Sequence, residues 1–372
     1  MDDVHVDPRT RTARVGPGAR WQQVDHETQA FGLATTGGVH SRTGVGGLTL
    51  GGGIGYLARS CGLAVDNLRA AEVVLADGRV VSASQEEHPD LLWALRGGGG
   101  NLGVVTSLEL QLYEVGPEVM TAQVFLPIEQ AADGLAFYRE LMADAADVFA
   151  CYALFVNVPP VDPFPVERHG QTCLALVACH AGELEAGAAD LAPLKAVGRP
   201  LSATVASMPY AKLQQSFDAG APDGARYYTR SGYLDELSDD LIAALVEGAG
   251  ELPFPLSNVF LEPMGGAVAR VEPTATAFPH RAARFNLGIQ AGWLEASQDA
   301  AASAWTRSLY ATLEPHTTGA VYVNYLDHDE KSRVHRAFGP NLERLRSVKA
   351  AYDPDDLFDV HGLGAGAEAL RG

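Results

Sequence analysis

Short runs of alternating apolar and polar residues recur through the first third of the chain and predict strands. The clearest case is the segment 70–84, where two β-branched runs are joined by Asp77-Gly78, a pattern typical of a hairpin. Residues 1–20 show the same alternation, with a turn at Gly16-Pro17-Gly18. A further strand is predicted over 103–115. Helical spacing is found over three segments: 21–31, 56–61 and 86–97.

Beyond Gly116-Pro117 the periods become longer, and helices alternate with apolar strands. Helices are predicted over 129–145, 235–248 and 297–314. Strands are predicted over 151–158, 172–180, 284–293 and 320–326. The tail 336–358 reads as a helix that stops at Asp353-Pro354. This texture predicts an α+β domain in which helices cover one face of an antiparallel sheet.

Length and charge narrow the possible functions. A chain of 372 residues is longer than a domain with a single hydrophobic core usually is, so two domains are predicted. The net charge of −19 argues against nucleic acid and against an acidic membrane surface as partners. No apolar run could span a membrane, and the start MDDVHVDPRT has no signal-peptide features, so a cytoplasmic location is expected. The cysteines and histidines lack metal-ligand spacing, so no metal site is expected. The oligomeric state is not indicated.

Two glycine-rich segments raise the question of a nucleotide site. The GxGxxG pattern at Gly98, Gly100 and Gly103 follows a predicted helix and precedes a strand, which is the reverse of the dinucleotide-binding order. The segment 43–57 (TGVGGLTLGGGIGYL) leaves its backbone bare. Such a backbone can approach a flat ligand or cradle an anion, but a packed turn without a ligand is an equal alternative.

An ordered series of motifs resembles a known family. Besides the segment 3–81, the chain contains DLLWALRGGGGNLGVVTSLEL, EPMGGAVARV, TAFPHR, AVYVNYLD and VKAAYDPDDLF. Together they are similar to the berberine-bridge-enzyme-like FAD-linked oxidases, which have the vanillyl-alcohol-oxidase (PCMH) type of FAD-binding domain. The resemblance implies an α+β fold with three parts: the second lobe of the FAD domain over 1–116, a substrate domain over 117–320 and a returning C-terminal segment over 321–372. The family's first FAD lobe has no counterpart, so weakened FAD binding is expected.

The resemblance also implies which residues contact the flavin. The matched positions are Gly38, Val39, His40, Thr43, Gly44, Gly46, Gly47, Gly53, Gly55, Val104 and Val105. His40 stands where doubly linked members have a cysteine, so a cysteinyl link to the flavin is not expected. Thr43 occupies the position thought to gate oxygen, and its small side chain suits an oxidase. His361 follows YDPDDLF, where members have polar flavin contacts, and is a candidate substitute.

The family's proton acceptor is often a tyrosine in a motif like AVYVNYLD. Tyr322 and Tyr325 are candidates, and in a regular strand only one of them could face the flavin. The match favours Tyr325, although core packing of both rings is the alternative. A phenol needs a nearby cation or donor to lower its pKa before it can act as a base. Arg230 and Gln290 are the candidate helpers at the substrate. His280 in TAFPHR is expected to be structural.

These features predict an FAD-dependent oxidase that takes a hydride from an alcohol or similar C–H centre of a small molecule and passes electrons to oxygen. Two alternatives stay open at this stage. One is a dehydrogenase with another electron acceptor. The other is a catalytically silent fragment or binding module. The identity of the substrate cannot be read, because the fold accommodates many.

Overall fold

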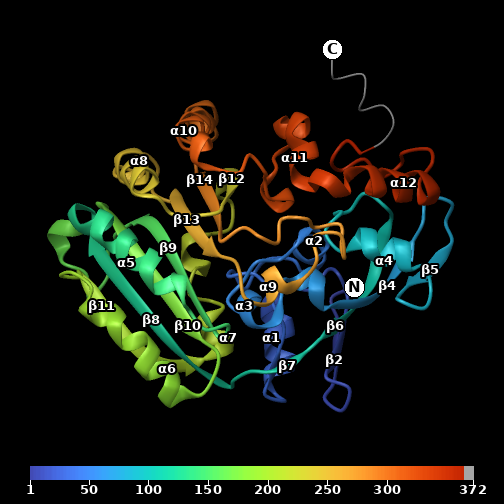
Figure 1. The fold of residues 1–372 in the computed structure, drawn as a ribbon, viewed down its shortest axis with the longest axis horizontal. Coiled ribbons are helices and arrows are strands. Elements are labelled where there is room, and N and C mark those ends of the chain that lie inside the picture. Colours follow the sequence, from blue (N-terminus) through green and yellow to red (C-terminus); the bar gives the residue numbers. More distant parts are fainter. Residues whose placement is uncertain (364–372) are drawn as a thin grey trace.

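The computed structural model describes residues 1–363, whose main elements are two antiparallel sheets (Figure 1). The first sheet has five strands in the order β1-β2-β6-β4-β5. Their bounds are β1 Val4–Asp7, β2 Thr12–Val15, β4 Leu68–Val74, β5 Val80–Ala83 and β6 Val104–Gln111. Strands β3 (Leu33–Ala34) and β7 (Tyr113–Glu114) form a small separate pair. The associated helices are α1 Trp21–Gln29, α2 Val45–Gly51, α3 Ala58–Cys61 and α4 Pro89–Leu95.

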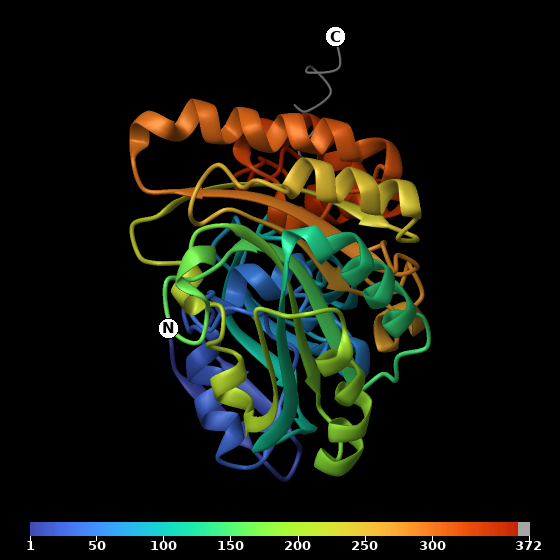
Figure 2. The ribbon, with the colours of Figure 1, turned by 90° about the vertical axis from the view of Figure 1, so that its left-hand side faces the viewer.

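The second sheet has seven strands in the order β11-β8-β10-β9-β13-β14-β12. Their bounds are β8 Glu118–Pro127, β9 Phe149–Asn157, β10 Thr172–His180, β11 Ser202–Pro209, β12 Arg226–Leu234, β13 Asn258–Pro263 and β14 Phe285–Trp293. Four helices supply apolar residues to the core on one of its faces: α5 Ala131–Ala143, α6 Leu184–Leu191, α8 Asp239–Ala249 and α10 Asp299–Leu313 (Figure 2). The opposite face turns toward the first sheet's elements, where Tyr152 and Leu154 join Tyr56 and Leu57 in a shared cluster.

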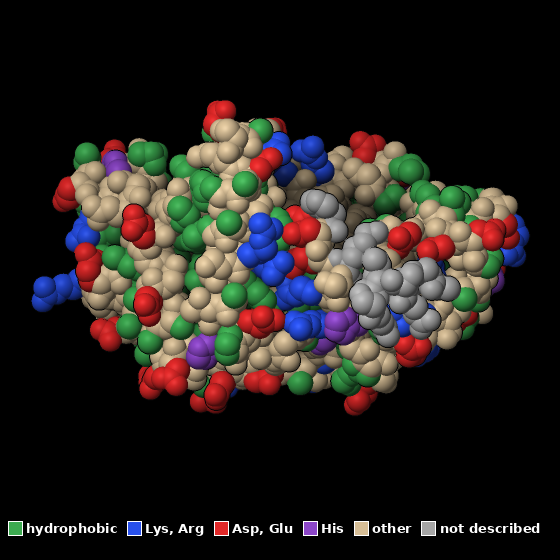
Figure 3. Space-filling view, turned by 90° about the horizontal axis from the view of Figure 1, so that it is seen from above, with side chains coloured by type: hydrophobic (Ala, Val, Ile, Leu, Met, Phe, Trp, Pro, Cys, Tyr) green, Lys and Arg blue, Asp and Glu red, His purple; other side chains and the backbone are tan. Residues whose placement is uncertain are grey.

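The remaining helices are short connections and the C-terminal elements. They are α7 Tyr210–Leu213, α9 Ala267–Arg270, α11 Val334–Phe338 and α12 Leu342–Tyr352. On the face that carries α10 and the C-terminal helices, acidic and basic side chains are interspersed (Figure 3), with pairs such as Arg226–Asp299, Arg307–Asp329 and Arg336–Glu314. No helix among residues 1–363 is both long enough and apolar enough to cross a bilayer.

Most of the predicted helices and strands are confirmed, because their apolar periods match the faces they bury. The α+β fold class is confirmed as well. The hairpin over 70–84 is β4 paired with β5, and the helix over 86–97 is α4. The GxGxxG segment does lie between a helix and a strand, α4 and β6. The structure leaves the three-part division at 116 and 320 as a prediction, although the two sheets fall on either side of Gly116.

Two predictions are wrong. Residues 320–326 are not a strand: the chain makes a 3-10 turn over Val323–Tyr325. Asn324 in this turn donates to the Leu48 carbonyl of α2 and Tyr325 to Glu262 on β13, while the backbone N–H of Tyr322 still donates to Ser231 Oγ on β12. The second error concerns 43–57, where the glycines predict a loop with a bare backbone. Val45–Gly51 forms the helix α2, in spite of its three glycines.

The C-terminal end of α2 explains several of these glycines. A Cβ built on Gly51 would lie 1.9 Å from Oδ1 of Asn324, and one on Gly52 would lie 2.7 Å from the Tyr322 ring. The backbone N–H of Gly53 donates to the Tyr322 hydroxyl at 2.6 Å, and Asn324 Nδ2 donates to that hydroxyl at 2.9 Å and to the Leu48 carbonyl at 3.0 Å. These glycines therefore let the segment 322–324 lie directly on the backbone of α2.

Two substitutions in α2 distinguish the effect of this contact on stability from the effect of helix propensity. Gly51→Ala places a methyl group against Asn324 and should lower the stability by about 1–3 kcal/mol, the usual cost of overpacking. Gly47→Ala meets nothing within 4 Å, so it should gain about 0.5–1 kcal/mol, because alanine is favoured over glycine in a helix. Urea unfolding of the two variants and the parent measures both. Equal destabilisation by the two substitutions would contradict this account.

Candidate active site

A cavity of about 660 Å³ lies between α2, the Gly99-Gly100 turn, the C-terminal segment and the inner face of the second sheet. Nine of the residues predicted from the sequence line it: Gly38, Val39, His40, Thr43, Gly47, Gln290, Tyr322, Tyr325 and His361. Residues from the two halves of the chain thus meet at one place. The cavity is also lined by residues that the sequence analysis did not select, among them Tyr152, Asn258, Phe260, Glu262 and Asn324.

The wall from the first half of the chain is largely bare backbone. Gly38, Gly47, Gly99 and Gly100 all line the cavity. At Gly47 a Cβ would point into open space, so a flat ligand can lie against the backbone there. The ring atom Nδ1 of His40 is buried and has no hydrogen-bond partner among the described residues. Burial lowers the pKa of His40, which keeps the imidazole neutral and able to bond to a ligand.

The C-terminal segment is fixed to this wall by Asn101, which is fully buried. Its Oδ1 accepts the backbone N–H groups of Val360 and His361 at 3.0 Å each. Its Nδ2 donates to the Gly98 carbonyl at 2.7 Å and to Nδ1 of His361 at 2.8 Å. Since Nδ1 accepts, the hydrogen-bond network assigns the ring proton of His361 to Nε2. His361 therefore brings a neutral imidazole, with its N–H on Nε2, to the cavity.

The other predicted flavin contacts lie outside the cavity lining. Gly44 is the N-cap of α2, and the Gly46 position is packed against Pro17. Gly53 and Gly55 sit against Ala64 and the Gly37 carbonyl. Val104 and Val105 begin β6, with Val105 in the core and Val104 half exposed.

Among the described residues, Arg230 forms no hydrogen bond or ion pair with Tyr325. Its guanidinium bonds to the Tyr228 hydroxyl at 3.3 Å and pairs with Glu330 at 3.3 Å. His280 is half-buried, bonds to the Ala337 carbonyl at 2.8 Å and packs on Tyr233, and desolvation lowers its pKa to about 4. These contacts support its expected structural role.

Tyr322 and Tyr325 lie together, because the 3-10 turn replaces strand geometry. Their rings meet edge to face at 4.9 Å between centroids, and both line the cavity. The Tyr322 hydroxyl is used by Gly53 and Asn324, as described above. The Tyr325 hydroxyl donates instead to Oε1 of Glu262 on β13 at 3.1 Å. Of the two tyrosines, Tyr325 is therefore the one that bonds to an acidic group.

Glu262 is the main residue that sequence reasoning missed. It is 2% exposed and accepts a second hydrogen bond from Asn286 Nδ2 at 2.6 Å. Burial raises its pKa from 4.5 to about 7, in spite of the bonds from Asn286 and Tyr325. Burial, and then the negative charge of Glu262, raise the pKa of Tyr325 well above 10. A lone acidic residue inside the apolar strand NVFLEP was the available signal.

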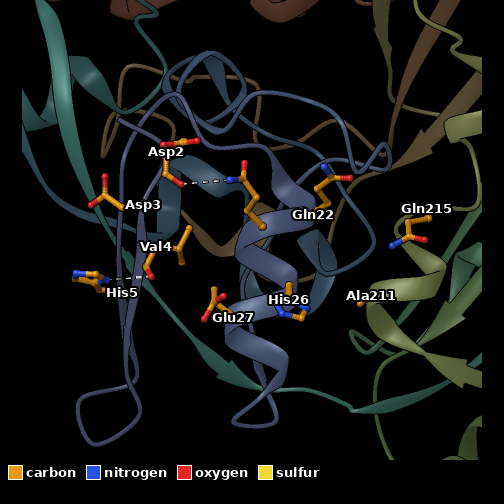
Figure 4. Close-up of a pocket in the computed structure, with 10 residues that line it drawn as sticks. Asp2, Asp3, Val4, His5, Gln22, His26, Glu27, Ala211 and Gln215 are labelled. Atoms are coloured by element: carbon orange, nitrogen blue, oxygen red, sulfur yellow. Dashed lines mark hydrogen bonds between the residues drawn. The ribbon is translucent and has the colours of Figure 1, made fainter.

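A second, more open depression lies beside α1 near the start of the chain (Figure 4). It is lined by acidic and histidine side chains together with amides: Asp2, Asp3, His5, Gln22, Gln23, His26, Glu27 and Gln215. Among residues 1–363 no group of histidine, cysteine and carboxylate side chains could hold a metal ion, and this depression is no exception.

The cavity between α2 and the second sheet fits the ring system of a flavin. Its glycine wall gives access to the backbone, and His40 and His361 bring neutral imidazoles to it. Within the described residues, the lining contains no lysine or arginine. A diphosphate group would therefore need backbone N–H groups or would lie beyond this cavity.

Comparisons with known proteins agree with this geometry. Residues 1–84 match the model of the FAD binding domain, and residues 321–362 match that of berberine and berberine-like proteins. The chain is 29% identical to an FAD-linked oxidoreductase of Dictyostelium discoideum, over 96% of this chain and 76% of that protein. It is 30% identical to (R)-6-hydroxynicotine oxidase of Paenarthrobacter nicotinovorans, over 96% of this chain and 78% of the relative.

Solved structures give the same result. The crystal structure of 6-hydroxy-D-nicotine oxidase from Arthrobacter nicotinovorans superposes with a TM-score of 0.83 at 25% identity, over 96% of this chain and 79% of that one. FAD is the cofactor of these relatives' family. On sequence and structure together, the chain belongs to the berberine-bridge-enzyme-like family of FAD-linked oxidoreductases.

Proposed function

We propose that this chain is an FAD-dependent oxidase that removes a hydride from an alcohol or similar C–H centre of a small molecule and passes the electrons to oxygen. The observation that carries the proposal is the hydrogen bond from Tyr325 to Glu262 at the cavity wall. Relatives named as oxidases, among them (R)-6-hydroxynicotine oxidase and xylooligosaccharide oxidase, support the choice of oxygen. Thr43, a small side chain that lines the cavity, supports it as well.

The flavin, when bound, accepts the hydride, and the protein's part is to hold the substrate and move one proton. In this proposal Gly38, Gly47, Gly99 and Gly100 hold the flavin ring. Tyr325 faces the substrate hydroxyl, and Glu262 lies behind it. As the substrate loses its proton to the Tyr325 oxygen, the Tyr325 proton passes to Oε1 of Glu262. The net result is one proton on Glu262 and a neutral phenol.

This relay explains how a phenol with a raised pKa can take part. A free phenolate base would need a cation beside it, but Tyr325 has a carboxyl partner instead. A carboxylate with a pKa of about 7 is an effective proton acceptor near neutral pH, since its protonated and ionised forms are then both populated. Tyr325 thus acts as a positioned conductor of the proton, and Glu262 as the base.

The relay predicts the behaviour of flavin reduction. Glu262→Gln and Tyr325→Phe should each slow anaerobic flavin reduction by about 10²–10⁴-fold, the usual contribution of a general base. In the parent the rate should rise with pH through about 7, as Glu262 ionises, and in Glu262→Gln this rise should disappear. Stopped-flow absorbance, with any alcohol found to bleach the flavin, measures both quantities.

The matched control for this experiment is Tyr227→Phe, which removes a buried hydroxyl that lies outside the cavity lining and has no hydrogen-bond partner within the described part of the chain. Its reduction rate should stay at the parent value. A normal rate in Tyr325→Phe together with a slow one in Glu262→Gln would make Glu262 the direct base. Normal rates in both would refute the proposed pair.

The same carboxyl predicts a pH dependence of stability. The folded chain holds the Glu262 proton up to about pH 7, whereas the unfolded chain releases it near 4.5, so folding becomes less favourable as pH rises between these values. The difference corresponds to about 3 kcal/mol. Glu262→Gln should therefore gain stability relative to the parent on going from pH 4 to pH 8. Urea unfolding measures this, and Glu247→Gln, at an exposed position, should show no such gain. If the stability of Glu262→Gln had the same pH dependence as that of the parent, the account of a buried acid would be contradicted.

A further inference from the structure

One part of the cavity contains a pair of side-chain amides that the proposed chemistry does not use. Asn258 on β13 donates through Nδ2 to Oε1 of Gln290 on β14 at 3.2 Å, and Gln290 donates through Nε2 to Oγ1 of Thr229 at 3.1 Å. Asn258 and Gln290 are directly opposite in the strand register. Both are half-buried and line the cavity, so each retains hydrogen-bonding capacity toward a ligand.

The distance between this amide pair and Glu262 follows from strand geometry. Asn258, Phe260 and Glu262 alternate along β13 and all face the cavity. Four residues at about 3.3 Å each place the two polar ends about 13 Å apart along the strand. That span corresponds to a molecule about two rings long.

The surface between the two polar ends is apolar. Phe260 lies opposite Leu154 in the register, and Val156 and Phe217 complete this part of the lining. The Phe260 ring covers Gly288 on the neighbouring strand, where a Cβ would come within 2.0 Å of it. A sugar's hydroxyl groups would lose their water here without gaining partners, which is costly for each group. An aromatic or aliphatic body would not suffer this loss.

The charges of the lining exclude another class of ligand. Across the described part of the chain, the lining contains one carboxyl group, Glu262, two histidines and no lysine or arginine. An anionic substrate would bury a negative charge that no cation of this lining pairs. An uncharged substrate meets no such penalty.

We infer that the substrate is an uncharged, elongated molecule with an apolar middle, whose oxidised carbon lies at Tyr325–Glu262 and whose far end carries a hydrogen-bonding group recognised by Asn258 and Gln290. This inference rests on the proposed function for the position of the reacting carbon. It assigns Gln290 to the far end of the substrate instead of a helper role beside Tyr325, and it adds Asn258 as a specificity-determining residue.

A matched set of ligands tests the inference by binding alone. The probes are 4′-(hydroxymethyl)biphenyl-4-carboxamide, its analogues with a methyl group or a carboxylate in place of the amide, and cellobiose. Titration calorimetry on the flavin-loaded protein, without oxygen, should show the carboxamide binding about tenfold more tightly than the methyl analogue, as expected for a hydrogen bond that the methyl group cannot make. The carboxylate should bind more weakly than either, and cellobiose should not bind measurably.

Three variants locate the preference. Asn258→Leu and Gln290→Met each remove an amide at similar volume and should reduce the carboxamide preference to less than about twofold. Gln298→Met makes the same Gln-to-Met change at an exposed position and should leave the carboxamide preference intact. If one cavity variant fails to fold, as judged by its melting curve, the other still decides the question.

The inference is overturned by an undiminished preference in the cavity variants that fold, by cellobiose binding as tightly as the carboxamide, or by a lack of binding of all biphenyl probes. Flavin reduction is recorded separately. Binding with the expected preference but without reduction would refute the proposed oxidation and leave the recognition of the far end standing.

Discussion

The close contact between the backbone of α2 and the segment 322–324 determines where the chemistry can occur. Tyr322 and Asn324 reach the backbone of Leu48 and Gly53 only because Gly51 and Gly52 carry no side chains. This contact sets the 3-10 turn, and the turn brings Tyr325 to Glu262. A strand here would have directed the two tyrosines to opposite sides. Part of the glycine run therefore serves contact between protein segments, whereas Gly47 and Gly38 leave space for a ligand.

The two halves of the cavity also need a rigid connection, which buried ionic side chains supply. Arg281 forms a two-pronged pair with Asp66 at 2.7 and 2.8 Å, and both side chains are at most 9% exposed. Arg59 on α3 donates to three carbonyls of the second half, those of Ala145, Phe149 and Met264. Removing one partner from such a buried pair typically costs about 3–5 kcal/mol, far more than for an exposed pair. The distance from the glycine wall to Glu262 is accordingly well fixed.

The sequence predicted the fold well where burial produces a period. Strands β9, β10 and β14 and helices α5, α8 and α10 all have the apolar repeats of the faces they bury. It failed where a side-chain contact with a distant segment decides the conformation, as for the glycine-rich α2 and the turn at Val323–Tyr325. The candidate site was reached through family motifs, and nine of its predicted residues do line one cavity. Glu262 and Asn258 could not be identified from the sequence, because their hydrogen-bond partners Tyr325 and Gln290 are distant along the chain.

Glu262 serves the proposed chemistry at the expense of the stability of the fold. Its carboxyl is kept in an apolar strand, where burial raises its pKa to about 7. An amide at this position could accept the same bond from Tyr325 without the charge. The fold therefore bears an ionisable group that lowers its stability as the pH rises from about 4.5 to about 7. A conflict of this kind is common at functional sites, where local rules of burial are broken. Because this pKa is about 7, Glu262 can both accept and release a proton near neutral pH. The physical feature that destabilises the strand is thus the one on which the proton relay through Tyr325 depends.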